Sequence, residues 1–331
     1  MRLGSFSRDP ASSCRLWLSG IERGETISVY IFRRLSQGII VLIGALVIVF
    51  CITSLFADPA KLMLPITSSQ VEYERLKAKL GFYDPAYIRF LRFAWGAIRL
   101  DFGKSLWQGV SAMQLVLERL GATAMLSFSA IGIATLIGVP FGSLAAVRPR
   151  SKLDRFCTIS SLTGVSIADF WLGLMLILLI AVDLRLLPTS GYGWKELILP
   201  ALTLSARPIG RIALVTRSAM LDELNRPYIT TARSKGLFER KVVFSHALKN
   251  AALTVVTLCG YEIGRIFAGY AVIVETVFGW PGIGQLAVQS ISNDDLPVVQ
   301  AVVFVAACIV VILNILIDLC YAFLDPRIRY T

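Results

Sequence analysis

The sequence predicts an all-α polytopic membrane protein with about six transmembrane helices. Of its 331 residues, 56% are hydrophobic, and the mean hydropathy is +0.69, a composition that is rare among soluble domains. Apolar runs of about 20 residues recur, each long enough to cross ~30 Å of hydrocarbon. The net charge of +11 usually reflects basic cytoplasmic loops in a membrane protein. No RNA- or DNA-binding motif accompanies that charge, so a nucleic-acid partner is not expected.

The N-terminal third is predicted to hold one span and a long loop. Residues 1–27 are polar and lack the apolar core and cleavage site of a signal peptide, so we expect a flexible N-terminal extension there. The first transmembrane helix is expected within 28–57, with its most apolar part at about 37–57. The polar stretch 58–121 follows, and its segment VEYERLKAKL predicts a short amphipathic helix.

The remaining residues, 122–331, are predicted to form the membrane core. Its spans are expected at about 122–147, 157–181, 197–220, 251–278 and 301–323. An even number of spans leaves both termini on one side. Because the short loop 148–156 and the loop 217–250 are rich in Lys and Arg, the positive-inside rule places them and both termini in the cytoplasm. The stretch 58–121 is then a long external loop with short helices.

The residue types that carry metal or catalytic chemistry are sparse. The six cysteines form no CxxC pair and lie mostly in apolar segments, so we interpret them as packing residues. The single histidine, His246, excludes a His-rich metal site within this chain. Neither HExxH nor GxSxG occurs, which argues against an intramembrane enzyme. No metal site or cofactor is therefore expected in the chain.

The most informative segment is YITTARSKGLFERKVVFSHALKN, residues 228–250. In a helix, Tyr228, Thr231, Ala232 and Lys235 share one face, which its small residues leave open to close approach. Gly236 permits the left-handed turn that ends a helix. A second helix is predicted to begin near Phe238. Its apolar stripe comprises Val243, Phe244, Ala247, Leu248 and Ala251. This helix–glycine–helix unit is either a projection that transmits force from a cytoplasmic partner or an amphipathic loop on the membrane surface.

This segment resembles the cytoplasmic coupling loop of ABC-importer permeases. That loop has the pattern Glu-Ala-Ala, three residues, Gly, nine residues, Ile-x-Leu-Pro. Thr230, Thr231 and Ala232 fall on the triplet, and Gly236 falls on the glycine. The departures at Thr230, Thr231, His246 and Lys249 are closer to the dipeptide/oligopeptide/nickel subfamily. The stretches YIFRRL (30–35), VETVFGWPGIG (274–284) and LDPRIRY (324–330) also resemble that subfamily.

The resemblance implies a permease subunit of a binding-protein-dependent importer in the bacterial inner membrane. The chain would form half of a pathway for peptides, with a homologous second permease, two ATP-binding subunits and an external solute-binding protein as partners, and with lipid around it. ATP and Mg would be bound by the ATP-binding subunits, because no Walker motif GxxxxGK[ST] occurs here. The pore subunit itself would not be catalytic. The coupling loop, 226–250, would contact an ATP-binding subunit through Tyr228, Thr230, Thr231, Ala232, Lys235, Gly236 and Leu237.

Four charged residues inside the predicted spans are candidates for the pathway, because intramembrane charge is costly. They are Arg207, Arg211, Glu262 and Arg265. The spacing of Glu262 and Arg265 predicts an ion pair. A leftover arginine could then face a peptide carboxylate, or all four could be satisfied by one another or by the second permease.

Three other residues in or next to the spans carry expectations. Glu275 is expected to orient the external turn that follows it, and Trp280 to lie in the interfacial aromatic belt. Asp318 is expected to have a buried polar partner and no part in transport.

Other functions stay open from the sequence. The same machine could carry nickel, glutathione or an oligosaccharide. An ion-coupled secondary transporter would need inverted repeats with a midplane ion site. No clear repeat is visible, and that interpretation leaves the coupling loop unexplained.

Overall fold

The computed structural model describes residues 27–56, 69–79 and 83–324. The predictions for residues 1–26, 57–68, 80–82 and 325–331 lie outside these ranges. Within the described part, the regular elements are helices, and five of them are long and apolar enough to cross a membrane. A bent pair, Lys152–Ser166 and Asp169–Asp183, makes a sixth if it counts as one span. The predicted class, an all-α protein with about six spans, is confirmed.

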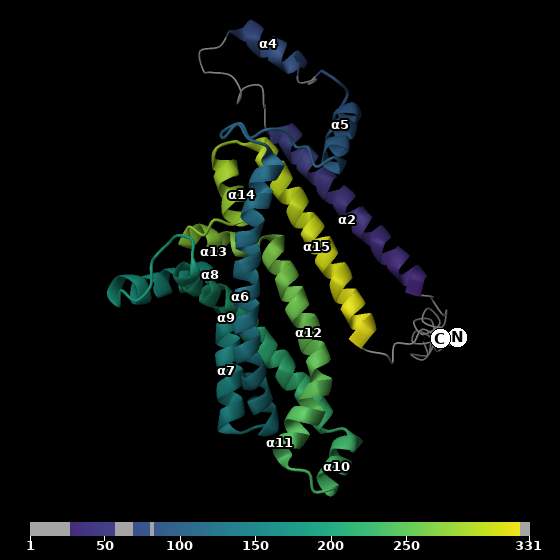
Figure 1. Ribbon diagram of the computed structural model, residues 1–331, viewed down its shortest axis with the longest axis vertical. Coiled ribbons are helices and arrows are strands. Elements are labelled where there is room, and N and C mark those ends of the chain that lie inside the picture. Colours follow the sequence, from purple (N-terminus) through teal and green to yellow (C-terminus); the bar gives the residue numbers. More distant parts are fainter. Residues whose placement is uncertain (1–26, 57–68, 80–82, 325–331) are drawn as a thin grey trace, which may run out of the picture.

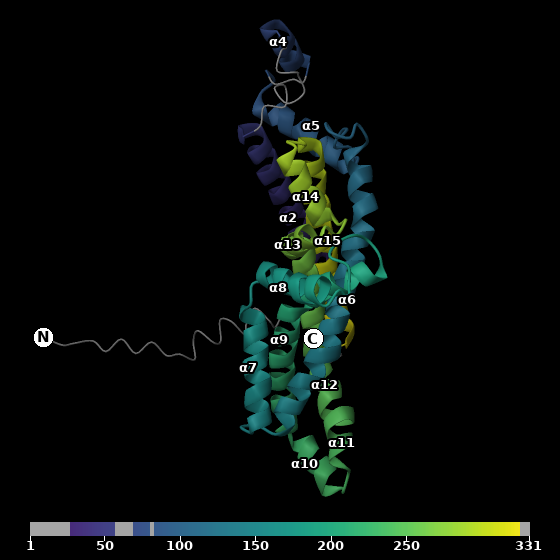
Figure 2. The ribbon, with the colours of Figure 1, turned by 90° about the vertical axis from the view of Figure 1, so that its left-hand side faces the viewer.

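Three long helices pack closely enough to act as one unit, called here the three-helix block. These are α6 (Ala112–Val147), α7 (Lys152–Ser166) and α9 (Trp194–Leu224), which run side by side in Figures 1 and 2. A methyl group on Gly142 would lie 2.3 Å from the carbonyl oxygen of Ala213, and one on Gly210 would lie 2.3 Å from that of Ser161. Only glycine permits backbones to approach so closely.

The helix α6 begins ten residues before the predicted start of the second span at residue 122, so its first turns fall within the predicted loop 58–121. Met113 and Val116 are buried in the core, while Glu118 faces outward on the same turns. This mixture of apolar and charged residues is typical of a helix that is half covered, and its low hydropathy is the reason why the stretch was predicted as part of the loop.

The first and last spans lie along the edge of the molecule. The helix α2 (Ile27–Phe56) runs beside α15 (Leu296–Leu324) in Figure 1. Gln300 donates a hydrogen bond to Thr53 Oγ1 (3.1 Å), and Arg34 Nε lies 3.0 Å from Asp318 Oδ2. Asp318 therefore has a polar partner, as predicted, but the expectation that this partner is buried is wrong, since the Arg34 and Asp318 side chains are 42% and 24% exposed.

The short helices of the predicted external loop lie at one end of the molecule. They are α4 (Gln70–Lys79), which matches the helix predicted from VEYERLKAKL, and α5 (Ala86–Ile98). Figure 1 shows them at the opposite end from α10 (Pro227–Ser234), which belongs to the predicted cytoplasmic loop. This separation is what the predicted topology requires, because the two loops were assigned to opposite sides of the membrane.

The third predicted span, 157–181, is not one continuous helix. Its first part, α7, ends at Ser166, and its second part consists of α8 (Asp169–Leu176) and the π-helical segment η1 (Ile177–Asp183). The two parts are bent by 99° relative to each other. Ile167 and Ala168 have extended backbone, with ψ of 135° and 129°. The expectation of one continuous helix was wrong here because the break contains no proline, and the polar Ser166 and Asp169 beside it are too few to lower the hydropathy of the run.

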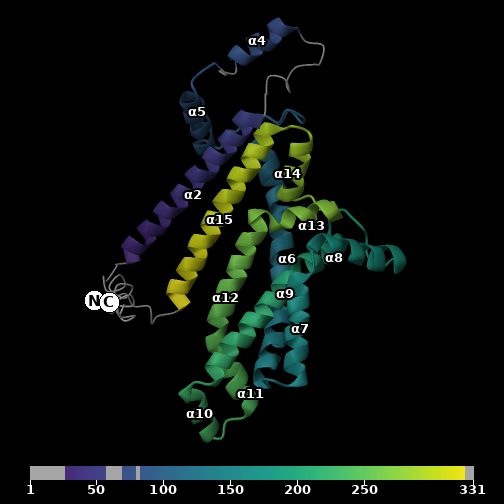
Figure 3. The same cartoon turned by 180° about the vertical axis from the view of Figure 1, so that it is seen from behind.

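The fifth predicted span, 251–278, is kinked. It consists of α12 (Leu248–Arg265), the π-helical segment η3 (Ile266–Tyr270) and α13 (Ala271–Phe278). Gly269 has φ of 120° and interrupts the helical backbone. In Figure 3, α13 turns away from α12 and lies beside α8, and both run crosswise to the long helices.

The turn after α13 is fixed by the buried carboxylate of Glu275. This carboxylate accepts hydrogen bonds from Thr123 Oγ1 (2.7 Å) and from the backbone N–H groups of Gly284 (2.8 Å) and Gln285 (3.1 Å). The turn leads into α14 (Ile283–Ser292). Glu275 therefore orients the turn, as predicted.

The expectation that Trp280 lies in the interfacial belt is wrong. Its side chain is fully buried, and its indole N–H donates to the carbonyl oxygen of Ala122 (2.9 Å). The left-handed backbone of Gly279 (φ 61°) turns the chain so that the ring packs inward.

Candidate functional site

The segment 226–250 has the predicted helix–glycine–helix form. The first helix, α10, has Pro227 at its start, where the missing N–H is harmless. Gly236 follows in the left-handed region, with φ of 75°. The second helix begins at Glu239 as α11 (Glu239–Lys241) and runs through the π-helical segment η2 (Val242–Ala247) into α12. The segment is therefore continuous with a membrane-spanning helix.

The segment is attached to the three-helix block by a compact apolar cluster, called here the base cluster. Ile229 and Ala232 of α10 are buried in it. Its other buried members are Ala146, Met220, Val242, Val243, Ala247 and Ala251. Ala146 lies in α6 and Met220 in α9, so displacement of α10 acts directly on two long helices. Ala232, predicted to contact a partner, is only 8% exposed and belongs to this base.

The apolar stripe of the second helix is shifted from its predicted position. Phe244 was predicted to lie on it but is 57% exposed, whereas Val242, outside the predicted stripe, is fully buried. The cause is η2, because a π-helical turn has more residues per turn than the α-helix on which the prediction was based.

The surface that faces away from the base holds most of the predicted contact residues. Exposed among them are Tyr228, Thr230, Thr231, Lys235 and Gly236, while Leu237 is half-buried. Arg233 and Glu239 form an ion pair of 2.6 Å across the Gly236 turn. The hydroxyl of Tyr228 donates to Glu223 and accepts from Asn250 Nδ2 (2.8 Å), which joins α10 to α9 and α12. These contacts order the exposed surface.

Phe238 was not among the predicted contact residues. Its side chain is 86% exposed at the tip of the segment, directly after the Gly236 turn. A signal was available, because Phe238 belongs to neither apolar face of the two predicted helices. Large aromatic side chains left in water are typical of binding surfaces.

The charged residues predicted inside the spans meet in one cluster, called here the arginine cluster. Glu262 is 3% exposed and contacts Arg211 (3.0 Å) and Arg265 (3.2 Å), so the predicted Glu262–Arg265 pair is present. Arg207 contacts Asp169 at 3.8 Å and donates to the carbonyl oxygen of Ile167 at 3.4 Å. Two guanidinium groups lie over the ring of Tyr270 in cation–π contacts. Those of Arg207 and Arg265 are 4.9 and 4.7 Å from the ring centroid.

Asp169 was not among the predicted site residues. It lies in the apolar run that was taken for a continuous third span. A carboxylate inside such a run is itself the signal that could have identified it, since a lone intramembrane charge needs a partner.

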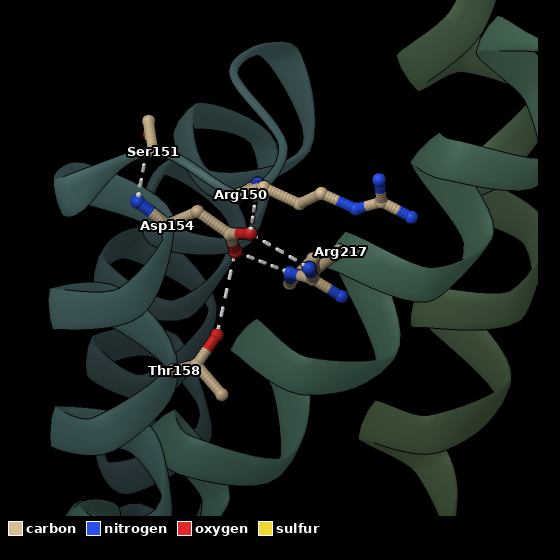
Figure 4. Close-up of polar contacts among 5 residues, drawn as sticks. All are labelled: Arg150, Ser151, Asp154, Thr158 and Arg217. Atoms are coloured by element: carbon tan, nitrogen blue, oxygen red, sulfur yellow. Dashed lines mark hydrogen bonds and ion pairs between the residues drawn. The ribbon is translucent and has the colours of Figure 1, made fainter.

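Outside the arginine cluster, an ion pair joins α7 to α9 at the end of the three-helix block nearest the base cluster. Figure 4 shows Asp154, which accepts two hydrogen bonds from Arg217, from Nε (2.5 Å) and from Nη2 (2.8 Å). The same carboxylate accepts from the N–H of Arg150 (2.8 Å) and from Thr158 Oγ1 (3.4 Å), while Ser151 caps the helix. The Asp154 side chain is 6% exposed. This two-pronged geometry favours a rigid link.

Comparison with known proteins assigns the family. Residues 138–330 match the family described as "Binding-protein-dependent transport system inner membrane component". The chain is 38% identical over 317 residues to the oligopeptide transport system permease protein AppB of Bacillus subtilis (strain 168), covering 92% of this chain and 100% of that protein. It is 35% identical over 335 residues to the dipeptide transport system permease protein DppB of Escherichia coli (strain K12), covering 91% and 98%.

The fold is shared with a solved transporter. A chain of the MetNI methionine ABC transporter, in an inward-facing conformation, aligns with a TM-score of 0.54 and 20% identity, over 64% of this chain and 97% of that one. At this identity the likeness concerns the fold alone. The family match covers more than half of the chain, and the two permeases match nearly all of it. The chain therefore belongs to the binding-protein-dependent transport system inner membrane components, the multi-pass permeases of ABC importers.

Proposed function

We propose that this chain forms one half of the translocation pathway of an ATP-driven peptide importer. A homologous second permease forms the other half, and an external solute-binding protein delivers the peptide. Two ATP-binding subunits bind ATP and Mg and hydrolyse the nucleotide, while this chain is not catalytic. The names of the related proteins, which are oligopeptide and dipeptide transport permeases, support the peptide as substrate.

The observation that carries this proposal is the construction of the segment 226–250. Its outer surface is exposed, with the polar Thr231 and Lys235 around the Gly236 turn and the aromatic Phe238 at the tip. Its underside is the base cluster, which is buried against α6 and α9. A loop that merely rests on lipid would need its apolar face directed outward. Here most of that face is buried in the base cluster, which leaves the outer surface for a protein partner.

This construction suggests how nucleotide energy reaches the membrane. Closure of the ATP-binding subunits would displace α10, and the base cluster would pass that displacement to α6 and α9. The Asp154–Arg217 pair would carry α7 along, because it joins α7 to α9. The result would be rigid-body movement of one half against the other, which opens the pathway alternately to each side.

Purification of the tagged chain from native membranes in mild detergent tests the proposal. We expect a second permease and ATP-binding subunits to co-purify, and the reconstituted complex to take up peptides only with ATP and the binding protein. A cysteine at Thr231 should cross-link to an ATP-binding subunit, whereas the control Ser111→Cys, on the exposed residue before α6, should not.

Two outcomes would reject the proposal. Uptake driven by an ion gradient without ATP would indicate a secondary transporter instead. ATP-dependent uptake of nickel, glutathione or an oligosaccharide, with no peptide taken up, would keep the machine and replace its substrate.

A further inference from the structure

Two interruptions of the membrane helices converge on the arginine cluster. The α7–α8 break at Ile167–Ala168 exposes the carbonyl oxygen to which Arg207 donates. The kink at Gly269 is followed directly by Tyr270, whose ring Arg207 covers. Figures 1 and 3 show α8 and α13 crossing the long helices at mid-height. Irregular backbone at membrane depth is tolerated only where it is buried in protein or lines a water-filled cavity.

The cluster also lies near the middle of its helices. Arg207 and Arg211 are roughly 20–26 Å from the start of α9, which is about 46 Å long at 1.5 Å per residue. The side chains of Arg207, Arg211 and Arg265 are 24%, 34% and 22% exposed in the chain alone. Arginines so placed cannot face lipid without a large cost. Their exposed side therefore faces the second permease or the passage between the two halves.

The charges in the cluster do not balance. Three arginines face two carboxylates, Glu262 and Asp169, which leaves a surplus of one positive charge. Glu262 is shared by Arg211 and Arg265, while Arg207 has only Asp169, at the long distance of 3.8 Å. Arg207 and Arg265 also contact the same aromatic ring, so their like charges lie near each other. A third carboxylate would neutralise the cluster and relieve this repulsion.

Hydrogen-bond donors are available for such a group. Among the described residues, the buried Nε of Arg207 and the hydroxyl of Tyr270 have no hydrogen-bond partner. Buried donors are normally paired, so each can donate to a ligand oxygen once the neighbouring side chains move to admit it. Arg211 lies one turn from Arg207 on the same face of α9 and is the most exposed arginine of the cluster.

We propose that Arg207, Arg211 and Tyr270 form a binding site in the passage for the C-terminal carboxylate of a peptide in transit. The inference rests on the proposed function, since it assumes that peptides pass this point. A single surplus charge, shared among groups that are already partly paired, suits a site that must release its ligand. The site would make passage depend on a free carboxylate, separately from any selection by the binding protein.

Uptake of paired substrates tests this inference. The complete transporter is reconstituted in liposomes, and ATP-dependent uptake is compared for a tripeptide and the same tripeptide with a C-terminal amide. Both are supplied at concentrations that saturate the binding protein. The variants are Arg207→Gln and Tyr270→Phe, the second of which keeps the ring against both arginines and removes only the hydroxyl. Lys195→Gln is the matched control, because it removes one exposed positive charge from the same helix outside the cluster.

We expect Arg207→Gln to lower the acid-to-amide uptake ratio by roughly tenfold and Tyr270→Phe to lower it by about three- to tenfold, in line with lost hydrogen bonds to a charged group. Lys195→Gln should leave the ratio unchanged. If both cluster variants reduce the two substrates equally, or reduce neither, the cluster only holds the helices together and the inference is wrong. If the wild-type complex takes up neither peptide, the proposed function fails instead. Should Arg207→Gln not assemble, Tyr270→Phe alone decides.

Discussion

The exposed ring of Phe238 provides the sharpest test of the coupling interpretation. Full burial of a phenylalanine side chain is worth about 1.5–3 kcal/mol. Phe238 is 86% exposed, so nearly all of that free energy is available when a partner covers it. Taking ~2 kcal/mol, Phe238→Ala should weaken docking of the ATP-binding subunit roughly 30-fold. The stability of the chain itself should change by less than about 0.5 kcal/mol, because the ring contributes little to the core.

The assay is titration of the purified ATP-binding subunits onto the permease pair in lipid nanodiscs. Phe244→Ala is the control, since this ring is 57% exposed in η2, beyond the turn. We expect normal docking for the control. An affinity within about threefold of wild type for Phe238→Ala, or an equal loss for both variants, would refute the idea that the tip anchors the partner.

Three further predictions concern other parts of the chain. Gly236→Glu should reduce uptake by roughly tenfold or more with normal membrane insertion, because it places a carboxylate on the contact surface. Gly236→Ala imposes the backbone strain of a φ of 75° without the charge, so it should reduce uptake less. Asp154→Asn should lower the free energy of unfolding in detergent by about 3 kcal/mol, since Arg217 loses its charged partner. The control Asp222→Asn, on the exposed surface, should change this free energy by less than about 0.5 kcal/mol. Glu275→Gln should cost about 1–3 kcal/mol in the same measurement, because the N–H groups of Gly284 and Gln285 and the hydroxyl of Thr123 would lose a charged acceptor. Equal melting of Glu275→Gln and wild type would contradict that role.

Much of the fold follows from hydrophobic length alone. An apolar run of about 20 residues has few alternatives to a transmembrane helix, so the number of spans could be predicted. The αL turn at Gly236 was also predictable, because glycine adopts positive φ without the cost that a side chain adds. The Glu262–Arg265 pair followed from helical spacing.

The errors have a common physical origin. The break after Ser166 and the shift of the stripe at Phe244 are both departures from regular α-helix that tertiary packing imposes. Hydropathy measures how apolar a segment is and carries no record of where its axis bends. The burial of Trp280 is of the same kind, since it depends on Thr123 and Glu275 holding the turn in place.

The close approach of the backbones in the three-helix block bears on where the protein can bend. At Gly142 and Gly210 no side chain separates the backbones in contact, so we expect a displacement of α9 to move α6 and α7 with it. Near the middle of the long helices the backbone departs from the helix at Ile167–Ala168 and at Gly269, and these are the places where we expect bending. Both places are beside Arg207. If the three-helix block moves as a rigid body and bends at these two breaks, a displacement at the base cluster would change the shape of the arginine cluster at mid-membrane.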